Sequence, residues 1–265
     1  MNRVRFFFVG MVMVFCSNAY EEIQESFVSF STPAYFGILE VMLESVHFFS
    51  TRPIVVYGIN CDIPFTQENF PRLIARRIDT DQFFEGHPSI CYMKFPIIYE
   101  SNIRYGVYIE ADDIANIGID TLFQEARRVK QFPLCPIHPA DPADQRACMD
   151  YLGVQSTTNP YVHGHIVFSR ESFAFLRECF GIALNLRSMG ANWDETLLNV
   201  MLWKYNVTDW YLPIYDPFYE SVQSYLDNPR SVSYGPFMFH GCKRVGQAWQ
   251  LFEKLKNNSI AKEST

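Results

Sequence analysis

Short apolar runs alternate along the chain with longer stretches in which apolar positions recur every three or four residues. Residues 54–59 and 105–109 are apolar on both faces, which is typical of strands covered by helices on each side. Residues 27–30 and 165–169 are also short and mainly apolar. These four runs predict strands.

The longer stretches predict helices. Between residues 33 and 49 the apolar side chains fall on one helical face. Further helices are expected at residues 70–78, 120–130, 171–184, 193–205 and 245–255. Pro96 leaves the type of the apolar segment 92–99 open, and repeated prolines between residues 131 and 160 predict a long loop. The chain after Trp210 is expected to be irregular until Gly235.

Strands that alternate with helices predict an α/β fold with a mainly parallel central sheet flanked by helices. No repeat or linker divides the chain, so we expect a single domain. The 265 residues are 48% hydrophobic and 16% aromatic, which suffices for a large core without a metal or disulfide. The formal net charge of −7 argues against a nucleic-acid partner, because phosphate contacts need an excess of Lys and Arg.

The first nineteen residues have the pattern of a secretory signal. Two arginines precede the apolar residues 6–15, and the small residues Ser17 and Ala19 follow. The apolar run is about half the ~20 residues that span a bilayer, so a signal peptide over 1–19 is favoured over a short anchor. A core strand or helix is the alternative. We therefore expect a secretory lumen, the periplasm or the exterior as the location, or the cytoplasm if the signal is unused, with membrane contact only through this segment. Export would permit disulfides, and Cys135 and Cys148 are the nearest pair.

Carboxylates cluster after the strand at 105–109. Glu110, Asp112 and Asp113 follow it directly, and side-by-side carboxylates at the end of a buried strand repel one another unless a cation lies between them. Mg²⁺ and Mn²⁺ prefer such oxygen ligands. A solvated acidic turn is the alternative interpretation.

A second group of polar residues follows near the C-terminus. His240 can complete an oxygen-rich metal site, Gly241 permits close approach of the backbone, and Lys243 offers an ammonium to a phosphate. A surface histidine followed by a solvated lysine is the alternative.

Together these residues resemble the GT-A superfamily of nucleotide-sugar glycosyltransferases, and within it glycosyltransferase family 8, which includes glycogenin and bacterial galactosyltransferases. Residues 108–112 resemble the strand that ends in the family's Asp-x-Asp metal motif. Residues 194–199 are similar to its Asp-Gln-x-x-x-Asn helix, and residues 240–243 to a shortened form of its His-x-x-Gly-x-x-Lys motif. Lys94 stands where the family has a basic residue near the donor. Glu110 replaces the first Asp, Glu195 replaces the Gln, and residues 162–164 differ from the family's Asn-small-Gly.

The resemblance implies a GT-A-like (Rossmann-like) domain over residues 26–257, followed by a polar tail at 258–265. It implies a metal-dependent hexosyl- or pentosyltransferase that moves a sugar from a nucleoside diphosphate donor, UDP first among them, to a glycan, protein or lipid hydroxyl with retention. The implied metal, Mn²⁺ or Mg²⁺, has as ligands Glu110, Asp112 and His240. The implied catalytic residues are Asp194, Glu195 and Lys243. The implied donor-binding residues are Ser31, Tyr35, Lys94, Gly241 and Lys243.

Several alternatives stay open. Asp194 and Glu195 are also explained by a favourable interaction with a helix dipole, worth ~0.3–1 kcal/mol. Tyr35 is either a stacking partner for a base or a core aromatic. His163 and His165 share a strand face and either line an acceptor cleft or pack in the core. For the whole chain, the alternatives are a catalytically inactive carbohydrate-binding or interaction protein of the same fold, and a metal-dependent phosphohydrolase.

Overall fold

The computed structural model describes residues 21–83, 90–137, 145–158, 160–186, 194–208, 212, 219–221, 226 and 238–263. The signal peptide expected at 1–19 lies outside the described residues, as do Trp193 and most of the segment 210–235. Within the described ranges, none of the helices combines the length and the apolar character needed to cross a membrane.

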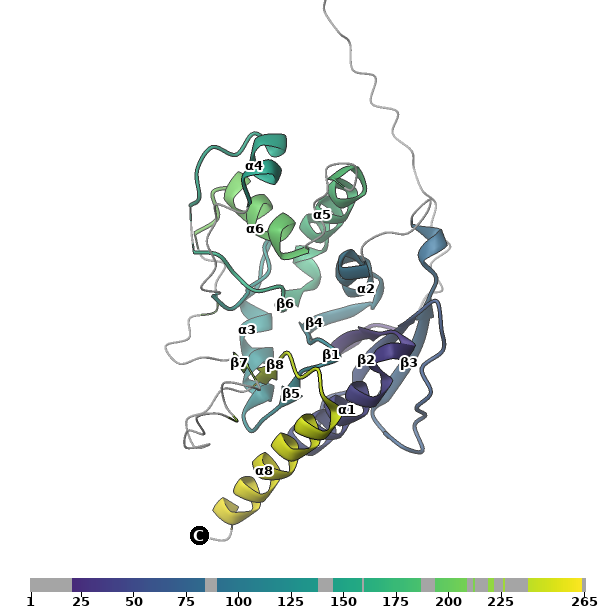
Figure 1. Ribbon diagram of the computed structural model, residues 1–265. Coiled ribbons are helices and arrows are strands. Elements are labelled where there is room, and N and C mark those ends of the chain that lie inside the picture. Colours follow the sequence, from purple (N-terminus) through teal and green to yellow (C-terminus); the bar gives the residue numbers. More distant parts are fainter. Residues whose placement is uncertain are drawn as a thin grey trace, which may run out of the picture.

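A five-stranded sheet forms the centre of the molecule (Figure 1). Its strands lie in the order β3-β2-β1-β4-β6, and the first four run parallel while β6 is antiparallel to β4. Their bounds are β1 Ile23–Ser31, β2 Ile54–Ile59, β3 Leu73–Ile78, β4 Ile103–Tyr108 and β6 Ile166–Ser169. The predicted mainly parallel α/β architecture is confirmed.

Two hydrophobic cores cover the two faces of this sheet. Because neighbouring strand residues point to opposite faces, Phe27 packs into one core and Val28 into the other. Helices α2, α5 and α6 lie on one side, and α1 with α8 on the other (Figure 1). The helices are α1 Phe36–Phe49, α2 Lys94–Glu100, α3 Leu122–Arg128, α4 Arg146–Leu152, α5 Phe173–Leu186, α6 Asp194–Lys204 and α8 Val245–Glu263.

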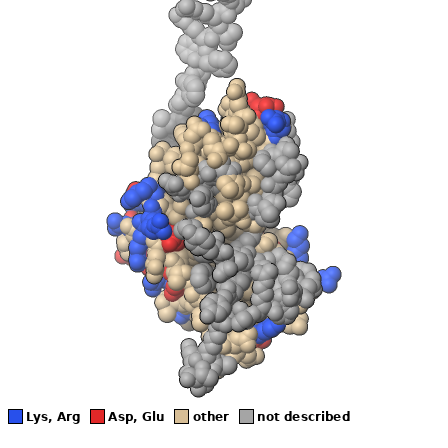
Figure 2. Space-filling model, turned by 90° about the vertical axis from the view of Figure 1, so that its left-hand side faces the viewer, with Lys and Arg blue, Asp and Glu red and all other residues tan. Residues whose placement is uncertain are grey.

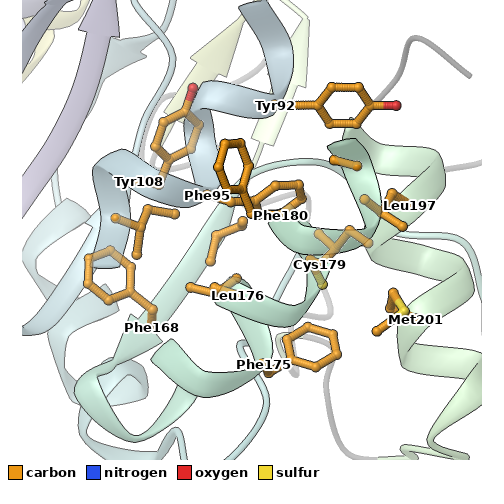
Figure 3. Close-up of a cluster of buried hydrophobic side chains, with 14 of the residues drawn as sticks. Tyr92, Phe95, Tyr108, Phe168, Phe175, Leu176, Cys179, Phe180, Leu197 and Met201 are labelled. Atoms are coloured by element: carbon orange, nitrogen blue, oxygen red, sulfur yellow. The ribbon is translucent and has the colours of Figure 1, made fainter. Parts of the chain in front are cut away.

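The core on the α2 side fixes the helix that carries the predicted catalytic acids. Leu197 and Met201 of α6 lie close to residues of α5, among them Cys179 and Phe175, in the buried cluster shown in Figure 3. This cluster buries Leu197 and Met201 almost completely. Burial of such side chains contributes ~1.5–3 kcal/mol each, so the start of α6 is held firmly above the sheet.

A second, smaller sheet brings the C-terminal segment beside the end of β4. Its strands are β5 Ile114–Ala115, β8 Met238–His240 and β7 Tyr219–Ser221, in the order β5-β8-β7. Ile114 pairs with Phe239 in an antiparallel register. The chain that follows β4 and the chain that follows β8 are therefore neighbours.

Two predicted segments have a different structure. Residues 70–78 were expected to be helical, but Leu73–Ile78 forms the edge strand β3, paired in parallel with β2. The segment 131–160, expected to be a loop, contains α4, which buries Cys148 and Met149. The apolar segment 92–99, whose type was open, contains the start of α2, with Pro96 in its first turn, where a missing N–H costs little.

The ends of the domain also differ from expectation. Helix α8 continues to Glu263, through most of the segment 258–265 that was expected to be a polar tail. Cys135 and Cys148, the nearest pair in the sequence, are both buried free thiols, so the structure has no disulfide between them.

Charged groups on the surface are unevenly distributed. On the face shown in Figure 2, the largest group of Lys and Arg lies along one edge, with smaller groups at the opposite edge, and much of the described surface between them is uncharged. Several arginines of the protein have glutamate partners: Arg52 and Arg127 both contact Glu25, and Arg170 contacts Glu22. The positive charge of these three arginines is therefore partly compensated by the two glutamates.

Candidate functional site

A cavity of about 240 Å³ opens at the carboxyl edge of the central sheet. Open α/β sheets bind ligands at this edge, beyond the ends of their parallel strands. Its lining includes the aromatic residues Phe30, Tyr35 and Tyr108 and the charged residues Lys94, Glu110, Asp112 and Asp194.

Three of the predicted donor-binding residues line this cavity, namely Ser31, Tyr35 and Lys94. Tyr35 is 44% exposed, so the alternative of a core aromatic is wrong. Gly241 and Lys243 do not line the cavity, and Lys243 is exposed. Gly241 has a φ of +74°, and a side chain there would meet nothing within 4 Å. The left-handed turn alone favours glycine here, and the expected close approach of this backbone to a bound donor stays a prediction.

Lys94 lies between two of the carboxylates that line the cavity. Only 2% of its side chain is exposed, and its ammonium forms an ion pair with Asp194 and a 3.2 Å hydrogen bond to Glu110 Oε1. The ammonium also lies 5.0 Å from the centre of the Tyr108 ring. Burial alone lowers the pKa of Lys94, but the carboxylates of Asp194 and Glu110 raise it well above its ordinary value. Lys94 is thus a permanent buried cation.

The end of β4 gathers three carboxylates. Asp113 is 1% exposed, and its Oδ2 accepts hydrogen bonds from the Glu110 N–H at 2.6 Å and from His165 Nε2 at 2.8 Å. Its Oδ1 is buried without a hydrogen-bond partner. Burial, followed by repulsion from Asp113 and Glu110, raises the pKa of Asp112 to about 7. Asp112 therefore experiences the repulsion that the sequence predicted, in a place where a cation would relieve it.

His240 lies next to this acidic strand end. The N–H of Cys242, two residues beyond it, donates a 3.3 Å hydrogen bond to the carbonyl oxygen of Asp112. The His240 ring is 5.5 Å from that of His163 and 6.2 Å from that of His165, measured between ring centres. Burial, with the neighbouring His165 and His163, lowers the pKa of His240 to about 3. A neutral imidazole keeps a lone pair available for a metal.

The carboxylates at the end of β4 and the imidazole of His240 are chemically suitable ligands for a divalent metal, although they are not gathered around one point. No three His, Cys, Asp or Glu side chains of the described ranges are placed to hold a metal ion together. Glu110 is bonded to Lys94 and Asp113 to His165. The carboxylate of Asp112, which its neighbours repel, and the neutral His240 are suitable ligands for a hard divalent cation. The buried Oδ1 of Asp113 adds an oxygen without a hydrogen-bond partner nearby.

The start of α6 supplies a second acidic pair. Glu195 Oε1 accepts a 2.8 Å hydrogen bond from the Gly164 N–H and lies 3.7 Å from His163 Nδ1. Burial alone raises the pKa of Glu195, but His163, Lys94 and the Gly164 N–H together lower it to about 2. The helix dipole does not account for these specific partners, so the dipole alone is not the reason for the two acids.

Several residues of the site carried little signal in the sequence. A Cβ atom at Gly164 would lie closer than 3.0 Å to Lys94 Nζ, Asp194 Oδ2 and Glu195 Cγ, so only glycine fits there. His165, one of the two histidines whose role was open, is buried against Asp113. These roles depend on contacts between distant segments, and the residue types alone do not reveal them.

Comparison with known proteins supports the fold. No protein-family model matches the sequence, and no curated protein matches it. The solved structure of the galactosyltransferase LgtC in complex with donor and acceptor sugar analogs is 14% identical over 89% of this chain and 95% of that chain, with a TM-score of 0.56. The glycosyltransferase GlyE of Streptococcus pneumoniae TIGR4 is 13% identical over 91% of this chain and 64% of that one, with a TM-score of 0.56.

A third similar structure is an active-site mutant of LgtC in which a glutamine is replaced by a glutamate. It is 13% identical over 88% of this chain and 95% of that chain, with a TM-score of 0.54. Identities this low establish the fold alone. The chain has the GT-A fold of these glycosyltransferases, and the predicted fold class is confirmed.

Proposed function

We propose that the protein is a glycosyltransferase that moves a hexosyl or pentosyl group from a nucleoside diphosphate sugar, with UDP as the nucleotide, to a hydroxyl group of a glycan, protein or lipid. The observation that carries the proposal is the cavity at the carboxyl edge of the sheet, which is lined both by aromatic side chains and by the buried Lys94 and Asp194 and the electrostatically repelled Asp112. A nucleotide sugar needs both kinds of lining, because its base is flat and its diphosphate is charged.

The aromatic side chains that line the cavity suit the nucleoside. The exposed ring of Tyr35 is available to stack on a base, and Ser31 offers a hydroxyl and backbone groups at the end of β1. Lys94 and Asp194 are much more buried than Tyr35, which supports a place beside them for the hydroxyl groups of the sugar.

The acidic strand end suits a divalent cation, Mn²⁺ or Mg²⁺, held by Asp112 and His240, with Glu110 as a further ligand once Lys94 releases it. When bound, such a cation acts as a Lewis acid on the two phosphates. Lys243, on the exposed turn after β8, would add positive charge as the diphosphate departs. The two sides of this site are joined by the hydrogen bond between Cys242 and Asp112.

Glu195, next to the cavity-lining Asp194 but not itself part of the lining, is the group that we assign to the sugar carbon. Its low pKa keeps it ionised, and Gly164 and His163 fix one of its oxygens. An ionised carboxylate can act as a nucleophile, which gives retention of configuration over two displacements, or it can stabilise positive charge on the sugar. Retention is the outcome that we propose.

One observation favours a second candidate, a carbohydrate-binding protein that has lost catalysis. Glu110 is engaged by Lys94, and the described residues hold no assembled metal cluster. The N-terminal sequence pattern supports an exported or lumenal location for either candidate.

A panel of nucleotide sugars, tested with and without Mn²⁺ for protection against thermal unfolding, is the first experiment, because a ligand that binds only the folded form raises its stability. Donor hydrolysis and transfer to simple sugar acceptors follow. Protection by a nucleotide sugar together with hydrolysis supports the enzyme. Protection by glycans alone supports the binding protein, and the absence of binding to every donor removes the proposal.

A further inference from the structure

Asn199, in the second turn of α6, is fully buried, and its three side-chain hydrogen bonds all join it to backbone groups around the site. Its Oδ1 accepts from the Val162 N–H at 2.8 Å, and its Nδ2 donates to the Val162 carbonyl at 2.9 Å and to the Glu195 carbonyl at 2.8 Å. An amide side chain carries both a donor and an acceptor, as a peptide group does. Asn199 therefore pairs with Val162 as a neighbouring strand would.

The segment after Val162 leads directly to the candidate site. His163 lies beside Glu195, and the Gly164 N–H holds the Glu195 carboxylate. At Gly164 there is no room for a Cβ atom, because Lys94, Asp194 and Glu195 press against it. A shift of the backbone at Val162 is therefore transmitted to these side chains.

We infer that Asn199 is a positioning residue that clamps the segment 162–164 onto α6 and thereby sets the Glu195 carboxylate against the Gly164 N–H. A helix presents no free backbone donors along its side, so the backbone of Val162 would be unsatisfied without this side chain. The other side of the segment is held by the hydrogen bond from His163 N–H to the Pro136 carbonyl, so Asn199 controls only the side that faces α6. The effect on turnover rests on the proposed function, whereas the clamp itself does not.

Amide hydrogen exchange tests the clamp directly. In Asn199→Ala we expect the Gly164 amide to exchange at least tenfold faster relative to the Val167 amide, which bonds to Leu134 in another part of the chain. Leu198→Ala is the matched control, because Leu198 is the adjacent, fully buried residue of α6. It loosens the same helix and should leave the ratio of the two exchange rates unchanged. Asn199→Asp, nearly the same size, keeps the acceptor but loses both donor bonds, and it serves as the test if the alanine variant does not fold.

Kinetics test the positioning role. In Asn199→Ala we expect turnover at saturating donor to fall at least tenfold while the donor Kd changes less than twofold, and Leu198→Ala should keep turnover within twofold. An unchanged exchange ratio overturns the clamp, and a changed ratio with unchanged turnover in an active enzyme overturns the positioning role. If the unaltered protein binds no nucleotide sugar, the proposed function fails, and the exchange ratio still decides whether Asn199 holds the segment.

Discussion

Two pairs of adjacent acids meet at the candidate site, and the protein treats them differently. At the start of α6, Asp194 forms an ion pair with Lys94, and Glu195 has a pKa of about 2 because His163, Lys94 and a backbone N–H compensate its burial. At the end of β4, Asp113 is paired with His165, but burial, followed by repulsion from its neighbours, raises the pKa of Asp112 to about 7. Both acids of the first pair have a specific partner, although burial still raises the pKa of Asp194, whereas Asp112 in the second pair is short of positive charge.

The difference indicates which parts of the site are permanent and which await a ligand. A buried carboxylate that has a cation and hydrogen bonds contributes to a fixed geometry, and removing its partner is costly. A carboxylate that lacks a cation costs stability until one arrives. We therefore expect loss of the Lys94–Asp194 ion pair to act mainly on folding, and substitution of Asp112 to act on ligand binding.

The largest effect is expected for Lys94→Met. Loss of the ammonium leaves Asp194 buried without its partner, and breaking such a pair costs ~3–5 kcal/mol of unfolding free energy. Urea unfolding followed by circular dichroism measures it. Lys204→Met, at the other end of α6, removes a partly exposed lysine 3.6 Å from Glu178 and should cost no more than ~1 kcal/mol. Equal stabilities of the two variants would contradict a fixed pair at the start of α6.

Asp112→Asn is expected to separate stability from function. Because it removes a repelled charge, the free energy of unfolding should stay the same or rise, while turnover falls about 100-fold or more, equivalent to ~2.7 kcal/mol. Calorimetric titration with a nucleoside diphosphate in the presence of Mn²⁺ should show that the metal no longer increases the affinity for this ligand. Asp62→Asn, at an 87% exposed side chain, is the control and should bind as the unaltered protein does. Full metal-dependent activity in Asp112→Asn would sink the proposed metal site.

Gly164→Ala tests the contact between the two regions. The added methyl group overlaps the Lys94–Asp194 pair, and such overpacking costs ~1–3 kcal/mol, with a parallel loss of turnover. Gly181→Ala in α5 is the matched control, because its Cβ meets nothing within 4 Å and alanine favours a helix by ~0.5–1 kcal/mol. Thermal unfolding of both variants should therefore shift in opposite directions. A stabilised Gly164→Ala would mean that the segment is not pressed against the ion pair.

The sequence predicted most of the central sheet because strands buried on both faces have a clear pattern. Residues 54–59 form β2, which is buried along its whole length, and the predicted strand 105–109 overlaps β4, Ile103–Tyr108, whose last three residues are buried. The edge strand β3 was not predicted because its arginines interrupt the apolar run. Arg76 is nevertheless buried and donates hydrogen bonds to Tyr57 and Ser101. Helix α4 was not predicted because prolines surround it.

For the site, the sequence predicted the charged residues that lie close together in the chain. It did not predict which distant residues those side chains contact. The order of Glu110, Asp112 and His240 indicated a charged pocket between two segments, and the second sheet brings those segments together. The bond between Lys94 and Asp194 joins residues 100 positions apart, and such a contact depends on how α2 and α6 pack on the sheet. Local patterns contain no information of that kind.

The smallest effect is expected for Lys243→Ala. Lys243 is exposed and lies outside the cavity wall, so its removal should leave the free energy of unfolding unchanged within ~0.5 kcal/mol. If the ammonium reaches the diphosphate as the sugar departs, turnover should fall about tenfold, equivalent to ~1.4 kcal/mol, with a smaller change in donor affinity. Lys130→Ala, which removes a 74% exposed lysine just after α3, controls for the loss of one positive charge. Equal turnover in the two variants would show that Lys243 is an ordinary surface lysine, and the positive charge for the departing diphosphate would then have to come from the strand end and Lys94 alone.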